Sequence, residues 1–339
     1  MPTVALLGCA HVHTPGFVNM LKQRQPEIKV RYVWDPNPAR AARWAPELAA
    51  GIIRSPARAL KDAEVQAVII CSETHRHKKL VIAAARAKKH IFAEKPLGLG
   101  AKDSYAMADA VTEAGVLFQT GYASRGQPAL LAVKEQVDAG HFGRITRVRG
   151  SMCHGGALGG WFDSKPGNPA EEWCWMADPR LAGCGAFGDL GTHMLDILMW
   201  FCGEVAEVTA DIRSITGRYG ACDETGEALI RFQNGVTGTL AAGWVDVANP
   251  VTLLVSGTEG HASVINGQLF LTSKKIPGAD GAKPFSPLPP ARPAGLALFL
   301  DALSTPTLPL VSVRQAAQRV AVMEAMYRAS AQRRWIKLK

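Results

Sequence analysis

Strand-like and helix-like segments alternate over the first 120 residues, and this alternation constrains the fold more than any other feature of the sequence. Alternation of this kind predicts a parallel sheet with helices on both faces. We therefore expect an N-terminal, doubly wound nucleotide-binding domain of about six strands over residues 1–121. Short apolar runs predict strands at Thr3–Leu7, Val30–Trp34, Val65–Ile70, Ile91–Ala93 and Val116–Gln119, and helical patterns lie at 14–24, 38–50, 78–88 and 102–114.

The pattern changes after residue 121, where successive strands replace the strand–helix units. The dipeptide Asn234-Gly235 between two strand-like runs is a strong hairpin signal. We expect an α+β domain with a large, mostly antiparallel open sheet over 122–311, followed by a closing helix and tail over 312–339 that pack back on the body. Its strands are predicted at 144–152, 205–212, 226–232, 236–244 and 251–256.

Composition excludes several classes of protein. No apolar run approaches the roughly 20 residues of a membrane span, and the start has no basic leader, so no membrane partner is expected. Seven cysteines without C-x-x-C spacing argue against a disulfide framework or a zinc knuckle and favour a reducing cytoplasm. The net charge of +9 suits an anionic partner, but it is spread along the chain, so nucleic acid is not expected.

Lys95 is the first candidate catalytic residue. It follows the short strand His90–Ala93, and ligands of open α/β sheets bind outside the strand carboxyl ends. Pro96 restrains the lysine to an extended backbone on a stiff turn. A lone Glu-Lys-Pro equally fits a solvated turn, so the choice between a catalytic lysine and a solvated one depends on the surrounding sequence.

The turn after the first strand is a weak dinucleotide fingerprint. Gly8 keeps the first glycine, Ala10 replaces the second with a small residue, and His13 places a ring where the third glycine belongs. Asp35 ends the second strand at the spacing of a carboxylate that binds a ribose 2′-hydroxyl, which favours NAD over NADP. A simple turn-forming Asp-Pro is the alternative for Asp35.

The same turn contains a possible metal pair. His11-x-His13 after a first strand resembles the H-x-H pair of amidohydrolase-type barrels, with His75, His77 and His193 as further donors. A barrel needs eight strand–helix units, and the pattern here changes after residue 145. The expectation is therefore that the site has no metal ligand.

Two further segments carry polar or aromatic candidates. The loop after the predicted strand Val65–Ile70 places Ser72, Glu73, Thr74 and His77 at the same sheet edge, where they would contact the coenzyme or simply be solvated. Tryptophans at 161, 173 and 175 lie in a glycine-rich segment and suit either the wall of a small-molecule pocket or core packing.

Asp189 and His193 are four residues apart at the start of a predicted helix, so they face the same side. A carboxylate beside an imidazole fixes its tautomer and raises its basicity, as a general base requires. Asp189 also suits the helix N-terminus electrostatically, which is a structural alternative.

Together these features resemble the Gfo/Idh/MocA family of NAD(P)-dependent oxidoreductases, typified by glucose–fructose oxidoreductase and inositol dehydrogenase. The matching residues are Gly8, Asp35, Glu94-Lys95-Pro96, Arg125, Pro128, Asp189-x-x-x-His193, Gly257-Thr258-Glu259-Gly260 and the helix Val313–Ala329. Ala10 and His13 depart from the family pattern and leave the grip on the pyrophosphate in question.

The resemblance implies a Rossmann domain, an open-sheet domain whose face mediates homodimer or homotetramer assembly, and an active site between the two. It implies that Lys95 polarises the reacting hydroxyl or carbonyl, that His193 is the acid/base and that Asp189 assists it. Glu94 and Lys95 are then expected at the coenzyme, and Tyr122, Arg125, Trp161 and Trp175 at the substrate. The expected reaction is hydride transfer between NAD and a secondary alcohol or ketone of a sugar, cyclitol or sugar derivative. A redox-neutral NAD-dependent glycosidase and a non-catalytic NAD- or sugar-responsive regulator stay open as alternatives.

Overall fold

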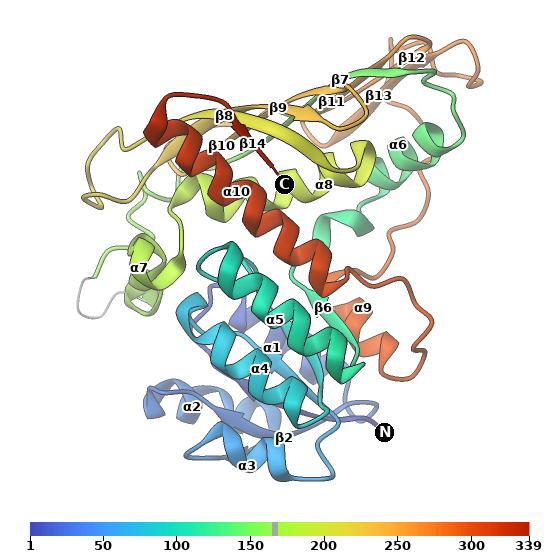
Figure 1. Ribbon diagram of the computed structural model, residues 1–339. Helices are drawn as coiled ribbons and strands as arrows, with labels where there is room; N and C mark the ends of the chain where they lie inside the picture. The colour runs from blue at the N-terminus through green and yellow to red at the C-terminus, as the bar shows by residue number, and fades with distance from the viewer. Residues whose placement is uncertain (165–168, 339) are drawn as a thin grey trace. The chain divides into compact units, whose positions relative to one another are not determined.

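The computed structural model describes residues 1–164 and 169–338 (Figure 1). It divides into two compact units that are interleaved along the chain. The first unit is Met1–Tyr122, Phe162–Gly183 and Ala294–Val320; the second is Ala123–Trp161, Cys184–Pro293 and Ala321–Lys339. Two segments beyond residue 121 thus belong to the first unit. The ranges predicted above for separate folding domains stay a prediction.

The first unit is built on a six-stranded sheet in the order β3-β2-β1-β4-β5-β6, with every pair of neighbours parallel. This order reverses between β1 and β4, which is the doubly wound Rossmann arrangement predicted from the sequence. The strands are β1 (Thr3–Leu7), β2 (Lys29–Trp34), β3 (Gly51–Ile52), β4 (Ala67–Ile70), β5 (His90–Ala93) and β6 (Phe118–Thr120).

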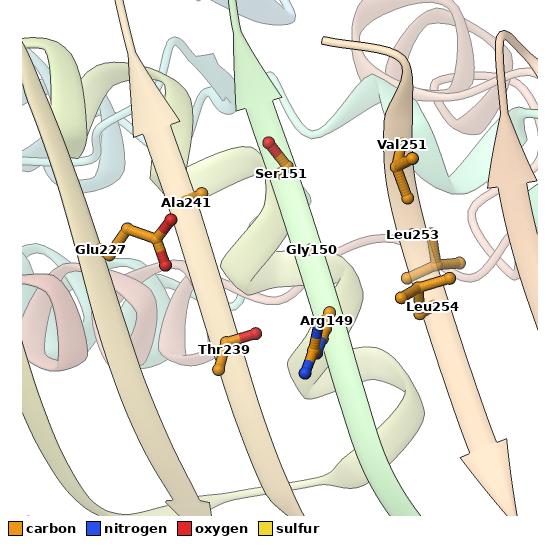
Figure 2. Close-up of a pocket in the computed structure, with 9 residues that line it drawn as sticks. All are labelled: Arg149, Gly150, Ser151, Glu227, Thr239, Ala241, Val251, Leu253 and Leu254. Atoms are coloured by element: carbon orange, nitrogen blue, oxygen red, sulfur yellow. The ribbon is translucent and has the colours of Figure 1, made fainter.

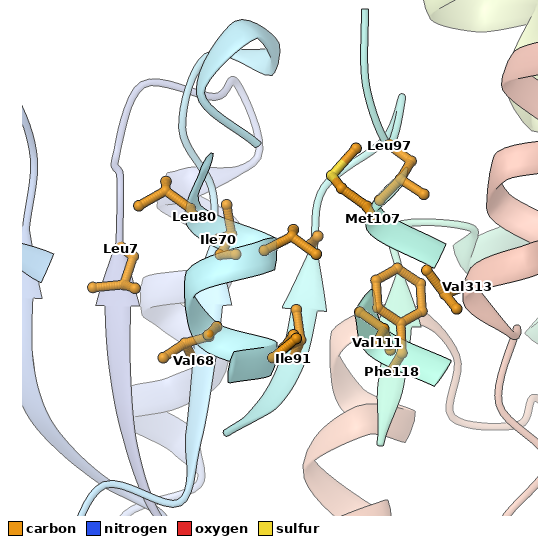
Figure 3. Close-up of a cluster of buried hydrophobic side chains, with 14 of the residues drawn as sticks. Leu7, Val68, Ile70, Leu80, Ile91, Leu97, Met107, Val111, Phe118 and Val313 are labelled. Atoms are coloured by element: carbon orange, nitrogen blue, oxygen red, sulfur yellow. The ribbon is translucent and has the colours of Figure 1, made fainter. Parts of the chain in front are cut away.

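The central strands are apolar because they are covered on both faces. Every residue of β1 and β4 is buried. Figure 3 shows one core of this unit, which includes Leu7, Val68, Ile70 and Ile91 of the sheet and, beside Leu97, Met107 of the helix α5 (Ala101–Ala114). The helices and short turns of this unit are α1 (Thr14–Gln23), α2 (Pro38–Trp44), η1 (Pro46–Leu48), α3 (Pro56–Lys61), η2 (Thr74–Arg76), α4 (His77–Arg86), α5 (Ala101–Ala114), η4 (Pro169–Ala177), α7 (Pro179–Ala182) and α9 (Gly295–Ala302).

Local differences from the predicted elements have simple causes. The helix expected over 38–50 ends at Trp44 and resumes as a short 3-10 turn, because Pro46 has no amide hydrogen to continue the helix. The strand β3 and the helix α3 were not predicted, since two and six residues give too little periodicity to detect.

The second unit is built on an eight-stranded sheet in the order β13-β12-β11-β7-β10-β9-β8-β14. All neighbours are antiparallel except β7 and β10, which are parallel. The predicted large, mostly antiparallel sheet is therefore confirmed. Its strands are β7 (Ile145–Cys153), β8 (Val205–Arg213), β9 (Thr225–Phe232), β10 (Thr237–Gly243), β11 (Val251–Gly257), β12 (Gly260–Ile265), β13 (Gln268–Ser273) and β14 (Ile336–Lys337).

One face of this sheet is covered by α8 (Ala186–Cys202). Glycines at the contact bring helix and sheet close together: a Cβ at Gly150 of β7 would lie 3.0 Å from Met194, and one at Gly191 would lie 3.4 Å from Ala242 of β10. Burial in β9 alternates with period two, as expected for a sheet with one covered and one open face.

The other elements of the second unit are η3 (Ala123–Gly126), α6 (Pro128–Asp138) and the end of α10 (Val313–Gln332), which begins in the first unit.

The fold bears on two features considered from the sequence, the barrel and a membrane-spanning helix. Neither sheet in the described residues is a closed parallel barrel, so the amidohydrolase alternative is wrong. Within residues 1–164 and 169–338, none of the helices combines the length and the apolar character needed to cross a bilayer.

Candidate active site

The first-strand turn packs directly against the loop after β4. Gly8 has φ +94, and a Cβ there would lie 2.4 Å from the Cβ of Ser72. Only glycine allows this approach without strain. The turn, the loop after β4 and the turn after β5 all follow strand carboxyl ends, which is where open α/β sheets bind nucleotides.

Asp35 ties the first-strand turn to the end of β2. Its Oδ2 accepts a hydrogen bond from the Cys9 amide at 2.7 Å, and its Oδ1 accepts one from the Asn37 amide at 2.7 Å. Arg40 Nε lies 2.9 Å from Oδ1. Burial raises the pKa of Asp35, opposed by the Asn37 amide and by Arg40. The carboxylate that the sequence assigned to the ribose is thus also a structural anchor.

Arg40 joins two of the predicted coenzyme residues and was missed in the sequence. Its second contact is Glu73, with Nη2 2.8 Å from Oε1, and Glu73 also pairs with Arg76 at 3.0 Å. Burial acts to raise the pKa of Glu73, but Arg40, the Glu73 backbone amide and Arg76 together hold it below the ordinary value. The arginine lies five positions after Asp35, in the first turn of α2. A search for charges near the end of β2 would have found it.

Glu94 lies at the centre of a charged cluster at the end of β5. The carboxylate is fully buried, with Oε1 2.9 Å from His13 Nδ1 and Oε2 2.8 Å from the Lys95 amide. Burial acts to raise the pKa of Glu94, but His13, His11 and the Lys95 ammonium hold it far below the ordinary value. Lys95 itself is 2% exposed, so its ammonium is presented from inside the protein instead of from a solvated turn.

His77 is a buried link between two loops. Its Nδ1 lies 3.2 Å from the carbonyl oxygens of Pro96 and Leu97, and its Nε2 lies 3.1 Å from the Ser72 carbonyl. Burial lowers the pKa of His77. Its side chain therefore orders the loop after β4 and the Lys95 turn. Thr74, in the same loop, is also buried.

The tryptophan-rich segment contributes to both units. Trp175, on η4, donates from Nε1 to the Ala10 carbonyl at 3.0 Å, and its ring centroid is 5.9 Å from that of His11. It therefore packs on the first-strand turn. Trp161 belongs to the second unit, is 48% exposed and has its ring centroid 5.0 Å from that of His154.

In the second unit, Arg125 is committed to an ion pair. Its Nε and Nη2 donate to the two carboxylate oxygens of Asp196 on α8, at 2.8 and 2.6 Å. Such a forked pair fixes both side chains. Tyr122, also predicted at the substrate, is buried in the first unit.

The helix α8 presents Asp189 and His193 one turn apart. Asp189 is buried, and its Oδ2 accepts a hydrogen bond from Trp244 Nε1 at 3.2 Å. His193 is half-buried. The two residues thus share a helix face in the second unit, while Lys95 belongs to the first.

The start of α8 is anchored by two residues that the sequence did not reveal. Asp223 accepts hydrogen bonds from the amides of Gly185 and Phe187, at 3.0 and 2.8 Å. Tyr327 on α10 accepts from the Gly188 amide at 2.9 Å and donates to Asp223 at 2.9 Å. Together they satisfy amides that the first turn of a helix leaves without intrahelical partners. Neither residue belongs to a recognisable motif, and both lie far from α8 in sequence.

Comparison with protein-family models gives two matches. The model described as "Oxidoreductase family, NAD-binding Rossmann fold" matches residues 3–122, and the model described as "GFO/IDH/MocA C-terminal domain" matches residues 130–263. The chain belongs to the GFO/IDH/MocA family of oxidoreductases. The family, the Rossmann fold and the NAD coenzyme predicted from the sequence are thereby confirmed.

Curated relatives and solved structures agree with this family. Levoglucosan dehydrogenase of Pseudarthrobacter phenanthrenivorans is 30% identical over 75% of this chain and 70% of its own length. The scyllo-inositol 2-dehydrogenase (NAD(+)) of Bacillus subtilis is 32% identical over 76% of this chain and 71% of its own length. A structure of levoglucosan dehydrogenase in complex with NADH and L-sorbose superposes with a TM-score of 0.82 at 23% identity, covering 100% of this chain and 99% of that chain. The last comparison shows the shared fold.

The described residues of this GFO/IDH/MocA protein fit a dinucleotide in two respects. Gly8 allows the close backbone approach that a pyrophosphate needs, and Asp35 stands at the end of β2. The departure is His13, which is the N-cap of α1 and directs its Nδ1 to Glu94. The glycine missing at this position is thus replaced by a ring that is held by a buried carboxylate.

Proposed function

We propose that this chain is an NAD-dependent dehydrogenase or reductase that acts on a secondary alcohol or ketone of a sugar, cyclitol or sugar derivative. The observation that carries the proposal is the buried Lys95, which adjoins the buried Glu94 at the end of β5 in a NAD-binding family. The relatives named for levoglucosan and scyllo-inositol support a carbohydrate-like substrate. They give no support to the glycosidase or the regulator.

The coenzyme would be held by residues of the first unit that follow the strand ends. When bound, NAD supplies the hydride acceptor, and the protein supplies position and charge. We assign the pyrophosphate to the first-strand turn, the ribose to Asp35, and the nicotinamide end to the loop after β4 and the Lys95 turn. The assigned residues are Gly8, Ala10, His11, His13, Asp35, Ser72, Glu73, Thr74, His77, Glu94 and Lys95.

Three side chains would carry the chemistry on the substrate. The Lys95 ammonium stabilises the negative charge that develops on the oxygen of the reacting alcohol. His193 accepts the hydroxyl proton, and Asp189 assists by fixing the imidazole. In the reductive direction His193 returns the proton and Lys95 polarises the carbonyl.

Four further residues are proposed for substrate contact. Trp161 is the best placed of these, because nearly half of its surface is exposed and an indole face stacks on sugar rings. The forked pair with Asp196 gives Arg125 a structural duty beside any contact with substrate. Tyr122 and Trp175 complete the set.

The open face of the second sheet supports the proposal of a homodimer or homotetramer. Figure 2 shows side chains from four adjacent strands, β9, β10, β7 and β11, around one hollow on this sheet. Val251 and Leu229 on these strands are 40% and 36% exposed, so the face offers apolar surface to a second copy.

We also propose a cytoplasmic location, because none of the seven cysteines, all within the described residues, forms a disulfide.

Substitution of Lys95 tests the assignment of the catalytic charge. Lys95→Ala should lower kcat by about a hundredfold or more, since it removes charge stabilisation of the transition state. NAD affinity, measured by fluorescence titration, should change little, because the other ten residues assigned to the coenzyme remain. The matched control is Lys78→Ala, which removes an exposed lysine paired with Asp103 and should leave kcat unchanged. Turnover at the wild-type rate in Lys95→Ala would remove Lys95 from the mechanism.

A further inference from the structure

The fold excludes the barrel that His11-x-His13 first suggested, but the two imidazoles still meet a carboxylate. One ligand atom each of His11, His13 and Glu94 lie within 4.8 Å of one another. His13 Nδ1 and Glu94 Oε1 are 2.9 Å apart, and the two imidazole centroids are 4.6 Å apart. The proton and charge transfers proposed above require neither imidazole. Both imidazoles and Glu94 are, however, among the residues assigned to the coenzyme, so an ion bound here would lie within the proposed coenzyme site.

We propose that His11, His13 and Glu94 form a binding site for a divalent first-row transition metal ion. Two histidines and one carboxylate are a donor set that binds zinc, iron and cobalt in proteins. With bonds of about 2.1 Å, neighbouring donors lie about 3.4 Å apart around a tetrahedral ion and about 3.0 Å apart around an octahedral one. His13 Nδ1 and Glu94 Oε1 are 2.9 Å apart, so small side-chain movements suffice for either geometry.

The carboxylate is prepared for this role by its surroundings. The Lys95 amide donates to Oε2 at 2.8 Å, which leaves Oε1 directed at His13. A Cβ at Gly121 would lie 2.5 Å from Oε2, so the carboxylate is enclosed on that side by backbone. A hydrogen bond to the second oxygen of a ligating carboxylate is the usual outer support of a metal site.

The two histidines differ in freedom. His11 is 2% exposed and packs against Trp175, and its Nδ1 accepts a hydrogen bond from the His13 amide at 3.2 Å. An ion that takes Nδ1 replaces that hydrogen bond. The side chain of His13 is 41% exposed, so it can rotate to complete the coordination and gives the ion a route from solvent. A buried pair of donors with one movable, exposed donor describes a site that loads from solution.

The alternative is that His13 and Glu94 form a plain ion pair that binds no metal. A cobalt titration distinguishes the two possibilities. Full-length protein is stripped with EDTA, dialysed and titrated with Co²⁺, with the bound metal counted by mass spectrometry. We expect one tightly bound ion per chain and a visible absorption spectrum of nitrogen and oxygen ligands, without a thiolate charge-transfer band. His13→Ala should weaken binding about tenfold or more. The His13→Ala variant should fold, because the His13 ring that it removes is half-exposed. Glu94→Gln, which removes the carboxylate, is the second variant.

The matched control is His141→Ala, which removes a half-buried histidine of the second unit and should bind cobalt as the wild type does. No stoichiometric cobalt, equal affinity in His13→Ala, or a thiolate band that the variants leave unchanged would each overturn the proposal. NAD binding is measured separately on the stripped protein. NAD binding without cobalt binding rejects the metal site and leaves the proposed function standing.

Discussion

At the scale of single residues, the site depends on buried charges that compensate one another. Glu94 is fully buried but stays ionised because His13, His11 and Lys95 face it. Asp35 is buried beneath Arg40, which also holds Glu73. Replacing one partner of such a pair by a neutral residue would leave the other charge buried without compensation.

The buried imidazole of His77 makes a prediction about pH. Its pKa in the folded protein lies below the ordinary 6.5, because of burial. As the pH falls below the ordinary value of 6.5, the unfolded chain binds a proton that the native state does not. The free energy of unfolding therefore decreases as the pH drops. The loss approaches about 1.4 kcal/mol per pH unit for one such group.

The measurement is the unfolding free energy of wild type and His77→Gln between about pH 8 and about pH 5. The variant should be less stable at pH 8 but should lose less stability on acidification. His141→Gln should show the wild-type slope, as it removes an imidazole outside these loops. Parallel pH profiles for wild type and His77→Gln would show that His77 does not resist protonation.

At the scale of elements, α8 carries the proposed acid/base pair and depends on its anchors. Tyr327→Phe removes the acceptor of the Gly188 amide and a donor to Asp223. We expect a loss of about 1–3 kcal/mol in stability, because a buried amide loses its partner. The kcat should also fall, since Asp189 lies in this first turn and His193 one turn later, while NAD affinity should be retained.

The control is Tyr105→Phe on α5, where the ring packs against the apolar core of the first unit. It should shift the stability by less than about 0.5 kcal/mol. Equal effects of the two variants on kcat, or wild-type stability of Tyr327→Phe, would show that the Tyr327 hydroxyl does not hold α8.

Elements with local signals could be predicted from the sequence, and those fixed by distant contacts could not. The strand–helix alternation predicted the Rossmann sheet, and the Asn234-Gly235 hairpin between β9 and β10 is present. One hairpin with a local signal was overlooked: β12 and β13 are joined at Asn266-Gly267, the same dipeptide, and both residues have a positive φ. The contact between Trp175 and Ala10 joins residues 165 positions apart, and no periodicity encodes such a contact.

The same division holds at the site. Lys95, Asp35 and the Asp189/His193 pair could be proposed from the sequence because each follows a strand end or opens a helix. Arg40 was missed because an arginine in the first turn of a helix normally reads as a solvated charge. Its position near Asp35 could be read from the sequence, but its contact with Glu73 arises only because β2 and β4 both lie beside β1.

At the scale of the whole molecule, the open face of the second sheet makes a prediction about assembly. Leu254→Lys places a charge in the hollow of Figure 2 and should lower the oligomeric state seen by light scattering. Ile215→Lys, at a site that is 62% exposed in a loop, should not change it. A monomeric wild type, or an unchanged oligomer in Leu254→Lys, would show that this face does not mediate assembly.

The measurement that tests the account most directly is the ultraviolet absorbance of NADH. Purified protein is mixed with NAD and a panel of free sugars, cyclitols, anhydrosugars and glycosides, with Lys95→Ala as the control. We predict net NADH formation with at least one member of the panel, and its loss in the variant. NAD binding without any NADH formation across the panel would contradict the dehydrogenase assignment and would point to a reaction that restores its own coenzyme.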